Sequence, residues 1–366
     1  MTAHAVTAPL AEPTAVIRRL SALDRYLPVW IFAAMGLGLL LGRLYPDLGA
    51  ALDRVKVAGV SVPIGIGLLW MMYPVLAKVR YESIGKHLGD RRILGTSLVL
   101  NWVLGPIVMF ALAWLFLPDL PAYRNGLILI GLARCIAMVL IWNNLASGSN
   151  ELAAVLVALN SIFQILTYSF LGWLFLTVIP GAFGGAGAAV DISMWDIAKS
   201  VLIFLGIPLL AGYVTRRMLV ARRGEPWYTN TFMPRFGPTA LVGLLYTIVL
   251  MFAMQGTRIL TLPLDVLRIA LPLVAYFFIM FGLSFVISAR MKFSYEETAS
   301  LSFTAAGNNF ELAIAVAIAT FGITSGEALA AVVGPLIEVP VLVGLVYVSL
   351  WARRRWFPAA TPASTA

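Results

Sequence analysis

Charged residues are scarce in this chain of 366 residues, at 12% of the composition, whereas 61% of the residues are hydrophobic. A water-soluble domain usually carries about 25% charged residues. Small size does not explain the shortage, because a chain of this length could build an ordinary water-facing surface. The scarcity argues against a soluble globular protein and predicts that much of the molecular surface faces lipid.

Cysteine and histidine are also rare. Cys135 is the only cysteine, and the two histidines, His4 and His87, fall in a tail and in a charged loop. One cysteine excludes an intrachain disulfide and a multi-cysteine metal site, and the histidines cannot form a catalytic triad or a metal cluster. The sequence contains no Gly-x-x-x-x-Gly-Lys-Ser/Thr nucleotide loop. We therefore expect no metal, no cofactor and no enzyme activity, and uphill transport would need an ion gradient or a separate ATPase subunit.

Long apolar runs are abundant, and each is too long to be a strand. In lipid such runs must be helical, because the backbone has no water to bond to. We count ten candidate spans, at residues 27–43, 60–79, 93–117, 125–146, 151–179, 196–219, 237–255, 266–289, 297–321 and 327–351.

The net charge of +9 reflects basic residues placed between these spans, where they can contact anionic lipid headgroups. This placement argues against nucleic-acid binding. With the N-terminus in the cytoplasm, eighteen Lys and Arg residues fall in cytoplasmic segments and six in outer segments. This positive-inside bias predicts an even number of spans and two cytoplasmic termini.

The two halves of the chain resemble each other. Leu152–Val155 recurs at residues 329–332, and Leu68–Trp70 recurs as the similar segment 244–246, at nearly the same offset. Five spans in each half make the second copy inverted, as in many secondary transporters. We expect a cytoplasmic tail without a signal peptide, a first repeat, an outer Gly/Ala-rich loop, an inverted second repeat and a cytoplasmic tail, at residues 1–26, 27–179, 180–195, 196–351 and 352–366.

Charges inside the spans are the most informative residues, since each costs about 2.5–3.5 kcal/mol at the bilayer centre. Arg134 precedes Cys135 in span four, and Glu311 follows Gly-Asn-Asn (307–309) in span nine. Both places lie close to mid-membrane, and an offset of 177 pairs Arg134 with Glu311. Gly and Asn are poor helix formers. Two polar breaks at equivalent places are the expected substrate site of a transporter.

Several alternatives stay open at this point. Arg134 and Glu311 could form a purely structural ion pair. Glu338, in span ten, could relay protons or brace a kinked helix. Asn160 and Gln164 in span five fit hydrogen bonds between helices better than substrate ligands.

Two motifs resemble the arsenical-resistance arsenite efflux permeases, a family of the bile acid/arsenite/riboflavin transporter superfamily. They are Gly-Leu-Ala-Arg-Cys-Ile-Ala-Met-Val (131–139) with a following Trp-Asn, and Gly-Asn-Asn-Phe-Glu-Leu-Ala-Ile-Ala-Val-Ala (307–317). The resemblance covers residues 25–350. It implies an all-α integral membrane protein with ten transmembrane helices in two inverted five-helix repeats. It also implies a panel domain, a core domain, and broken helices four and nine that cross.

The resemblance also implies site residues. The essential cysteine of the family maps onto Cys135 and its essential glutamate onto Glu311. The remaining site-lining assignments are Arg134 as a supporting charge, Asn143, Asn308 and Asn309 as substrate-binding residues, and Glu338 as a second proton-coupling residue.

This chemistry fits arsenite, which is mainly a neutral trihydroxide at pH 7 with a thiophilic arsenic. One thiol gives an exchangeable contact, amides can bond the hydroxyls, and a buried carboxyl group can carry a proton. The hypothesis is arsenite/proton antiport across the plasma membrane that confers arsenic resistance, with antimonite as a second candidate substrate. A sodium-coupled organic-anion symporter of the bile-acid type is the alternative. An intramembrane enzyme is disfavoured, because Cys135 has no histidine near it.

Overall fold

The computed structural model describes residues 26–52, 54–57, 60–79, 90–136, 138–182, 192–261 and 263–357. These residues are almost entirely helical. The strands among the described residues are β1 (Lys56–Val57) and β2 (Val60–Ser61), which pair as a short antiparallel hairpin. Most of the two predicted tails, the centre of the predicted outer loop, His4 and His87 lie outside the described residues.

Helices long and apolar enough to cross a membrane number six in the described part of the chain, and the other apolar helices are shorter. The long ones span Arg91–Phe116, Asn150–Ala182, Met194–Arg223, Glu225–Met254, Leu264–Arg290 and Gly326–Trp356. The shorter ones span Val29–Leu44, Val62–Ala77 and Phe310–Phe321. Their length and composition agree with an integral membrane protein.

Most of the predicted spans correspond to one helix or to helices joined end to end. The first three comprise α3 (Leu27–Leu44), α5 (Val62–Ala77), and α7 (Arg91–Val99) with η2 (Leu100–Leu104) and α8 (Gly105–Phe116). The fifth comprises α11 (Asn150–Trp173), η3 (Leu174–Val178) and α12 (Ile179–Ala182). The sixth comprises α13 (Met194–Val201), η4 (Leu202–Gly206) and α14 (Ile207–Arg223). The seventh, eighth and tenth are α17 (Thr239–Thr261), α18 (Pro263–Arg290) and α21 (Gly326–Trp356). The segments η2, η3 and η4 are single π-helical turns, which are rare and often mark functional places.

The fourth and ninth predicted spans are broken. The fourth consists of α9 (Pro121–Leu132) and α10 (Val139–Leu145), and the ninth of α19 (Tyr295–Ala306) and α20 (Phe310–Phe321). Short elements fill the connections: α4 (Leu48–Leu52), α15 (Glu225–Trp227), η5 (Tyr228–Phe232) and α16 (Met233–Phe236).

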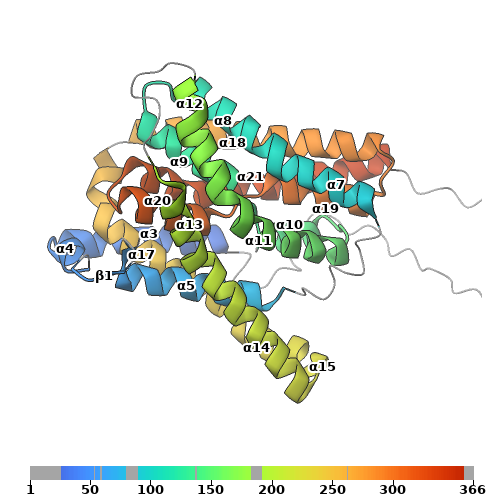
Figure 1. Ribbon diagram of the computed structural model, residues 1–366, viewed down its shortest axis with the longest axis horizontal. Helices are drawn as coiled ribbons and strands as arrows, with labels where there is room; N and C mark the ends of the chain where they lie inside the picture. Colours follow the sequence, from blue (N-terminus) through green and yellow to red (C-terminus); the bar gives the residue numbers. More distant parts are fainter. Residues whose placement is uncertain are drawn as a thin grey trace, which may run out of the picture.

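The helices pack in two groups. In the first, α3 and α5 pack on α17 and α14 packs on α5, and in the second, α8, α9, α18, α19, α20 and α21 pack on one another. The first group lies along the lower side of Figure 1, where α14 and α15 extend away from the rest, and α8 and α18 lie along the upper side. The helix α13 contacts α20 of the second group and continues through η4 into α14 of the first group, and it thereby connects the two groups.

The close contact between α3 and α17 depends on small residues. A Cβ atom at Gly38 would lie 2.5 Å from the Val249 carbonyl oxygen, and one at Gly42 would collide with the Ala253 carbonyl. Glycines four residues apart let two helix backbones approach in lipid, where apolar surface alone does not drive association. The first helix group is therefore held by backbone proximity along this pair.

Replacement of Gly38 by valine should loosen this contact. Because the nearest atoms belong to the backbone of α17, they cannot rotate away, and we expect a loss of about 1–3 kcal/mol. The check is the thermal unfolding midpoint of the purified protein in detergent. Gly36→Val is the matched control, since nothing lies within 4 Å of its added Cβ. An equal fall of the midpoint in both variants would refute the interpretation.

Candidate functional site

Two helix breaks meet in the second helix group. Residues 133–138 separate α9 from α10, and residues 307–309 separate α19 from α20. The two breaks pair as an isolated antiparallel β-bridge between Arg134 and Asn308. The predicted polar breaks are thus brought into direct contact, although more than 170 residues separate them along the chain.

Two backbone hydrogen bonds form this crossing. The Cys135 N–H donates to the Gly307 carbonyl at 3.2 Å, and the Asn309 N–H donates to the Ala133 carbonyl at 3.1 Å. A Cβ atom at Gly307 would lie 2.9 Å from the Cys135 Cβ and 3.5 Å from its Sγ. Glycine is needed here for close approach rather than for backbone freedom, because its φ of −71° suits any residue.

The two asparagines of the second break cap helix ends. The Asn308 Nδ2 donates to the carbonyls of Ile130 at 2.8 Å and Ala133 at 3.2 Å, at the end of α9. The Asn309 Oδ1 accepts from the Leu312 N–H at 3.0 Å, at the start of α20. Helix ends leave backbone groups unbonded, and leaving such groups unbonded is costly inside a membrane.

Arg134 is completely buried and points toward α8 and α18. Its Nη1 donates to the Tyr276 hydroxyl at 2.7 Å, and a Cβ at Gly105 would lie 2.6 Å from that nitrogen. Its backbone N–H donates to the Gln164 Oε1 at 3.1 Å. None of the ion pairs found among the described residues joins Arg134 to Glu311, so the structure gives no support to the ion-pair alternative.

Cys135 lies on the other side of the same break. Successive side chains of an extended segment point to opposite faces, so the thiol is directed away from the Arg134 guanidinium and toward Gly307. The side chain is only 3% exposed, and its Sγ accepts from the Val139 N–H at 3.3 Å, at the start of α10. The thiol therefore lies at the crossing itself.

The two predicted proton-coupling residues lie beside the second break. Glu311 is half-buried in the first turn of α20, whereas Glu338 is 2% exposed within α21. The Glu338 Oε1 accepts from the Asn308 N–H at 3.3 Å. Both glutamates therefore border the second break, Glu311 through its place two residues after Asn309 and Glu338 through this hydrogen bond. Gly334 leaves room for the Phe310 ring, which packs against α21 and keeps this part of α20 close to Glu338.

Asn143, the remaining predicted site residue, is buried near the end of α10. Its Nδ2 donates to the Asn150 Oδ1 at 3.1 Å, and its Oδ1 accepts from the Ser300 hydroxyl at 2.8 Å. Ser300 precedes Gly307 by about 10 Å of helix. Asn143 therefore ties the turn between α10 and α11 to α19, about two helical turns from the crossing.

Several buried polar atoms near the breaks have no hydrogen-bond partner among the described residues. They include Arg134 Nε and Nη2, Asn308 Oδ1, Asn309 Nδ2 and Trp142 Nε1. Buried polar atoms without partners are rare in proteins and call for an explanation, such as a ligand or water. Both donors and acceptors are present, which suits a small solute that carries hydroxyl groups.

Tyr276 is a feature of the site that sequence reasoning missed. Tyr276 is a fully buried tyrosine in the middle of α18, and a hydroxyl at mid-span was the available signal, since a buried Tyr hydroxyl usually has a partner. Gln164 was expected to form hydrogen bonds between helices, and its side chain joins α11 to the first break by accepting from the Arg134 N–H.

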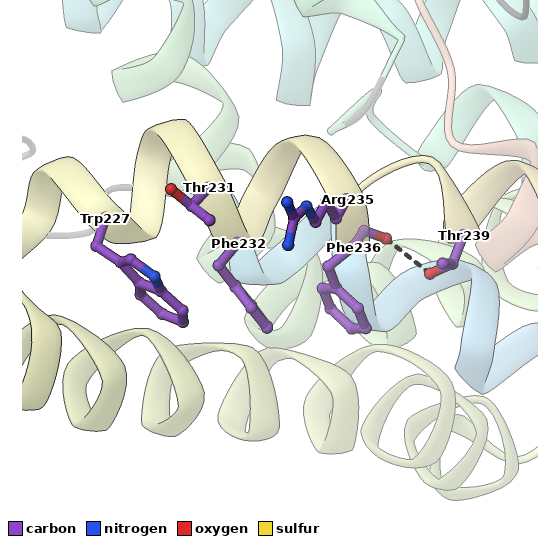
Figure 2. A pocket seen from close by; sticks show the side chains of 6 residues that line it. All are labelled: Trp227, Thr231, Phe232, Arg235, Phe236 and Thr239. Atoms are coloured by element: carbon purple, nitrogen blue, oxygen red, sulfur yellow. Dashed lines mark hydrogen bonds between the residues drawn. The ribbon is translucent and has the colours of Figure 1, made fainter.

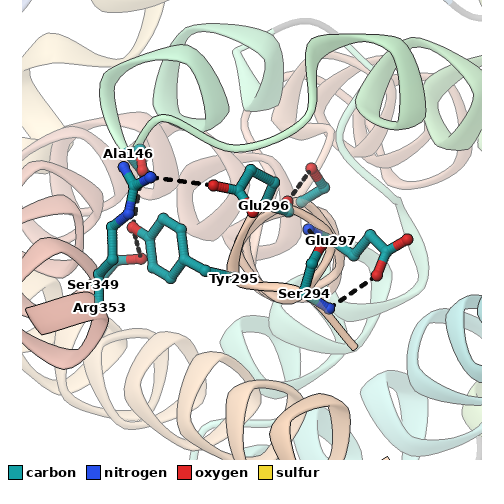
Figure 3. Close-up of polar contacts among 8 residues, drawn as sticks. Ala146, Ser294, Tyr295, Glu296, Glu297, Ser349 and Arg353 are labelled. Atoms are coloured by element: carbon teal, nitrogen blue, oxygen red, sulfur yellow. Dashed lines mark hydrogen bonds and ion pairs between the residues drawn. The ribbon is translucent and has the colours of Figure 1, made fainter. Parts of the chain in front are cut away.

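One end of the site is anchored by the contacts shown in Figure 3. The Tyr295 hydroxyl donates to the Ala146 carbonyl at 2.7 Å and contacts the Ser349 Oγ at 2.9 Å. Arg353 forms a 3.0 Å ion pair with Glu296. These contacts fix the start of α19 to the end of α10 and to α21, so the half-helices that approach the crossing share one support.

The sequence of this chain is similar to those of known membrane transporters. The sequence pattern of the sodium bile acid symporter family matches residues 65–262. An arsenical-resistance protein named Acr3 from Corynebacterium glutamicum is 54% identical over 340 residues, which cover 93% of this chain and 92% of that protein. The Acr3 of Alkaliphilus metalliredigens is 35% identical over 92% of this chain and 94% of its own length. A Synechocystis protein named as an uncharacterised transporter is 36% identical, with coverage of 93% and 91%.

Replacement of Gly307 by alanine should open the crossing. The added Cβ must push the Cys135 segment away, and we expect the thiol to react with a maleimide about fivefold faster or more, which corresponds to ~1 kcal/mol. Cys135 is the only thiol in the chain, so the alkylation rate of the folded protein in detergent reports on this place alone. Gly282→Ala is the control, because nothing lies within 4 Å of its added Cβ. Unchanged alkylation in Gly307→Ala would show that the contact does not hold the crossing closed.

Proposed function

Because the chain belongs to the sodium bile acid symporter family and, within it, to the arsenical-resistance transporters named Acr3, we propose that it exports arsenite from the cell in exchange for protons. The family is one of transporters and not of enzymes. The observation that carries the substrate assignment is the 54% identity to a protein named for arsenical resistance, over nearly the full length of both chains. Antimonite remains a second candidate substrate.

The proposal includes ten membrane spans in two inverted five-helix repeats. Its support is the pair of breaks in the fourth and ninth predicted spans, since two inverted copies that meet at mid-membrane would bring such breaks together. Their local pairing is antiparallel. In the proposal, the helix group of α3, α5, α14 and α17 is the panel domain and the group that contains the crossing is the core domain, and the division of the helix contacts into two groups supports this. The bias of basic residues assigns both termini to the cytoplasmic side of the plasma membrane.

In this proposal the substrate binds at the crossing. The Cys135 thiol offers arsenic a soft ligand, and a single thiol allows the release that transport requires. The unpaired amide atoms of Asn308 and Asn309 offer hydrogen bonds to the hydroxyl groups. Asn143 contributes through the turn that it holds against Ser300, and Arg134 contributes a positive charge on the far side of the break.

Protons are proposed to couple at Glu311. This carboxyl group is half-buried beside the crossing, in the first turn of α20, and Glu338 borders the same break. Glu338 also accepts a hydrogen bond from the backbone of Asn308. A change in the charge of Glu311 can therefore change the strength of the polar contacts that hold the second break. An inward-moving proton that reaches Glu311 would then favour arsenite release on the outer side.

Sodium-coupled symport of an organic anion is kept as the second candidate, because the matched family includes sodium bile acid symporters. Oxygen atoms of Asn308, Asn309 and Glu311 could contribute to a sodium site, as hard cations prefer oxygen ligands. A sodium requirement for arsenite transport, or for uptake of an organic anion, would favour this candidate. A separate ATPase subunit is possible within the proposal and is not required by it.

Cys135→Ala should lower arsenite transport into everted membrane vesicles by about tenfold or more, since a lost ligand that costs ~1.4 kcal/mol changes affinity tenfold. Cys135→Ser is the matched control for size, and we expect it to be equally impaired because oxygen is a poorer ligand for a soft metalloid than sulfur. If both variants retain the wild-type rate and affinity, the thiol is not a substrate ligand.

Glu311→Gln should abolish arsenite accumulation against its gradient while a normal proton gradient is present, because the amide cannot carry the proton. Downhill exchange of arsenite should be less affected. Accumulation is measured in the same vesicles with and without an uncoupler. The matched control is Glu151→Gln, which removes an exposed carboxylate at the start of α11. Uphill transport by Glu311→Gln at the wild-type level would disprove coupling at this residue.

A further inference from the structure

The connection between α14 and α17 is ordered and packs against α5. Gly224 ends α14 with a φ of +83°, a conformation that suits glycine, and the chain turns directly into α15 and η5. The fully buried Tyr228 donates its hydroxyl hydrogen to the Ala77 carbonyl at 2.8 Å, at the end of α5. The segment from residue 225 to residue 236 is therefore fixed against the first helix group.

This segment carries a surface groove of about 280 Å³, shown in Figure 2. Three aromatic rings of the lining form a row: the Trp227 and Phe232 ring centres are 5.8 Å apart, and those of Phe232 and Phe236 are 5.1 Å apart. The groove is completed by Thr231, Arg235 and Thr239. The lining is mostly apolar, so water is a poor occupant for most of it.

Positive charge flanks the aromatic row. Arg235 is an exposed member of the lining, and the Arg223 guanidinium carbon lies 4.6 Å from the centre of the Trp227 ring. The nearby carboxylate of Glu225 is already engaged, because Arg216 Nη2 bonds both of its oxygens, at 2.8 and 2.9 Å, and the Thr229 hydroxyl donates to it at 3.2 Å. None of the ion pairs found in the described part of the chain involves Arg223 or Arg235, so the edge of the groove presents positive charge there.

The position of the groove favours an amphiphile. It lies in the first half of the apolar stretch Glu225–Met254, directly after the stretch Met194–Arg223, and each stretch is long and apolar enough to cross a membrane. The turn between two such stretches is expected close to the membrane–water boundary. A free phosphate would satisfy the arginines and leave the aromatic row uncovered. A volume of about 280 Å³ lies just below the usual range of about 300–1,000 Å³ for organic ligand sites, which suits the first part of an acyl chain.

We propose that this groove binds an anionic phospholipid, with its headgroup phosphate held by the arginines at the groove edge, Arg223 and Arg235, and one acyl chain along Trp227, Phe232 and Phe236. Bound lipid would join α14 to the start of α17 at the membrane surface. The site is independent of the substrate crossing, and the proposal does not depend on which solute is transported.

The test is lipid binding to the purified full-length protein, after removal of copurified lipid, by native mass spectrometry. Phosphatidylglycerol is compared with phosphatidylcholine of the same acyl chains. We expect the wild type to prefer phosphatidylglycerol. The double variant Arg223→Gln/Arg235→Gln should lose affinity for it by about thirtyfold, or roughly fivefold for each arginine near the surface.

The matched control is Arg290→Gln/Arg354→Gln, which removes two exposed arginines from the ends of α18 and α21, outside the groove lining. We expect it to retain the wild-type affinity for phosphatidylglycerol. Equal losses in the two double variants would overturn the proposal, because they would indicate general attraction to a basic protein. Competition by soluble glycerophosphoglycerol as effective as that by the whole lipid would overturn it too, since the acyl chain would then contribute nothing.

A second measurement places the acyl chain. Phosphatidylglycerol that carries bromine on its acyl chains should quench the tryptophan fluorescence of the wild type more than that of Trp227→Phe, which keeps an aromatic ring in the groove. Equal fractional quenching in the two proteins would show that the chain does not lie on the aromatic row. Thermal unfolding midpoints of all variants establish that each is folded.

Discussion

Backbone pairing between two broken helices is the constraint on which the rest of this structure depends. A helix that stops inside a membrane leaves amide and carbonyl groups without partners, and lipid supplies none. Here each break supplies partners to the other, through the bonds of Cys135 to Gly307 and of Asn309 to Ala133. The chain can therefore place irregular polar segments within its apolar body. Without this mutual pairing, neither break would be tolerated alone.

The same requirement divides the polar residues around the crossing into two kinds. Gln164, Glu338 and the Asn308 amide nitrogen are engaged with backbone groups of the breaks. The remaining donors and acceptors, such as Arg134 Nη2 and Asn309 Nδ2, have no partner among the described residues. Substitution of the first kind disturbs the architecture as well as any chemistry, so a loss of transport there would not by itself identify a substrate ligand.

Much of this organisation was readable from the sequence. Hydrophobic length predicted the helices, and Gly-Asn-Asn at 307–309 predicted a break, because poor helix formers in a long apolar run have no other ready explanation. The repeat offset suggested that the two breaks were equivalent. The pairing of Arg134 with Asn308 could not be predicted, because it is set by how distant helices pack. For the same reason, the sequence around Arg134 did not predict that Gly105 and Tyr276 would enclose its guanidinium group.

The crossing also gathers four helix termini in one place. The carbonyl ends of α9 and α19 approach it together with the amide ends of α10 and α20. Each terminus carries a partial charge of roughly half an elementary charge, negative at a carbonyl end and positive at an amide end. The two negative and two positive ends sum to no net charge, so the backbone adds no excess charge of either sign to the crossing. In the proposed function, discrimination between charged and neutral solutes is therefore assigned to side chains, of which Arg134 and Glu311 carry opposite formal charges when both are ionised.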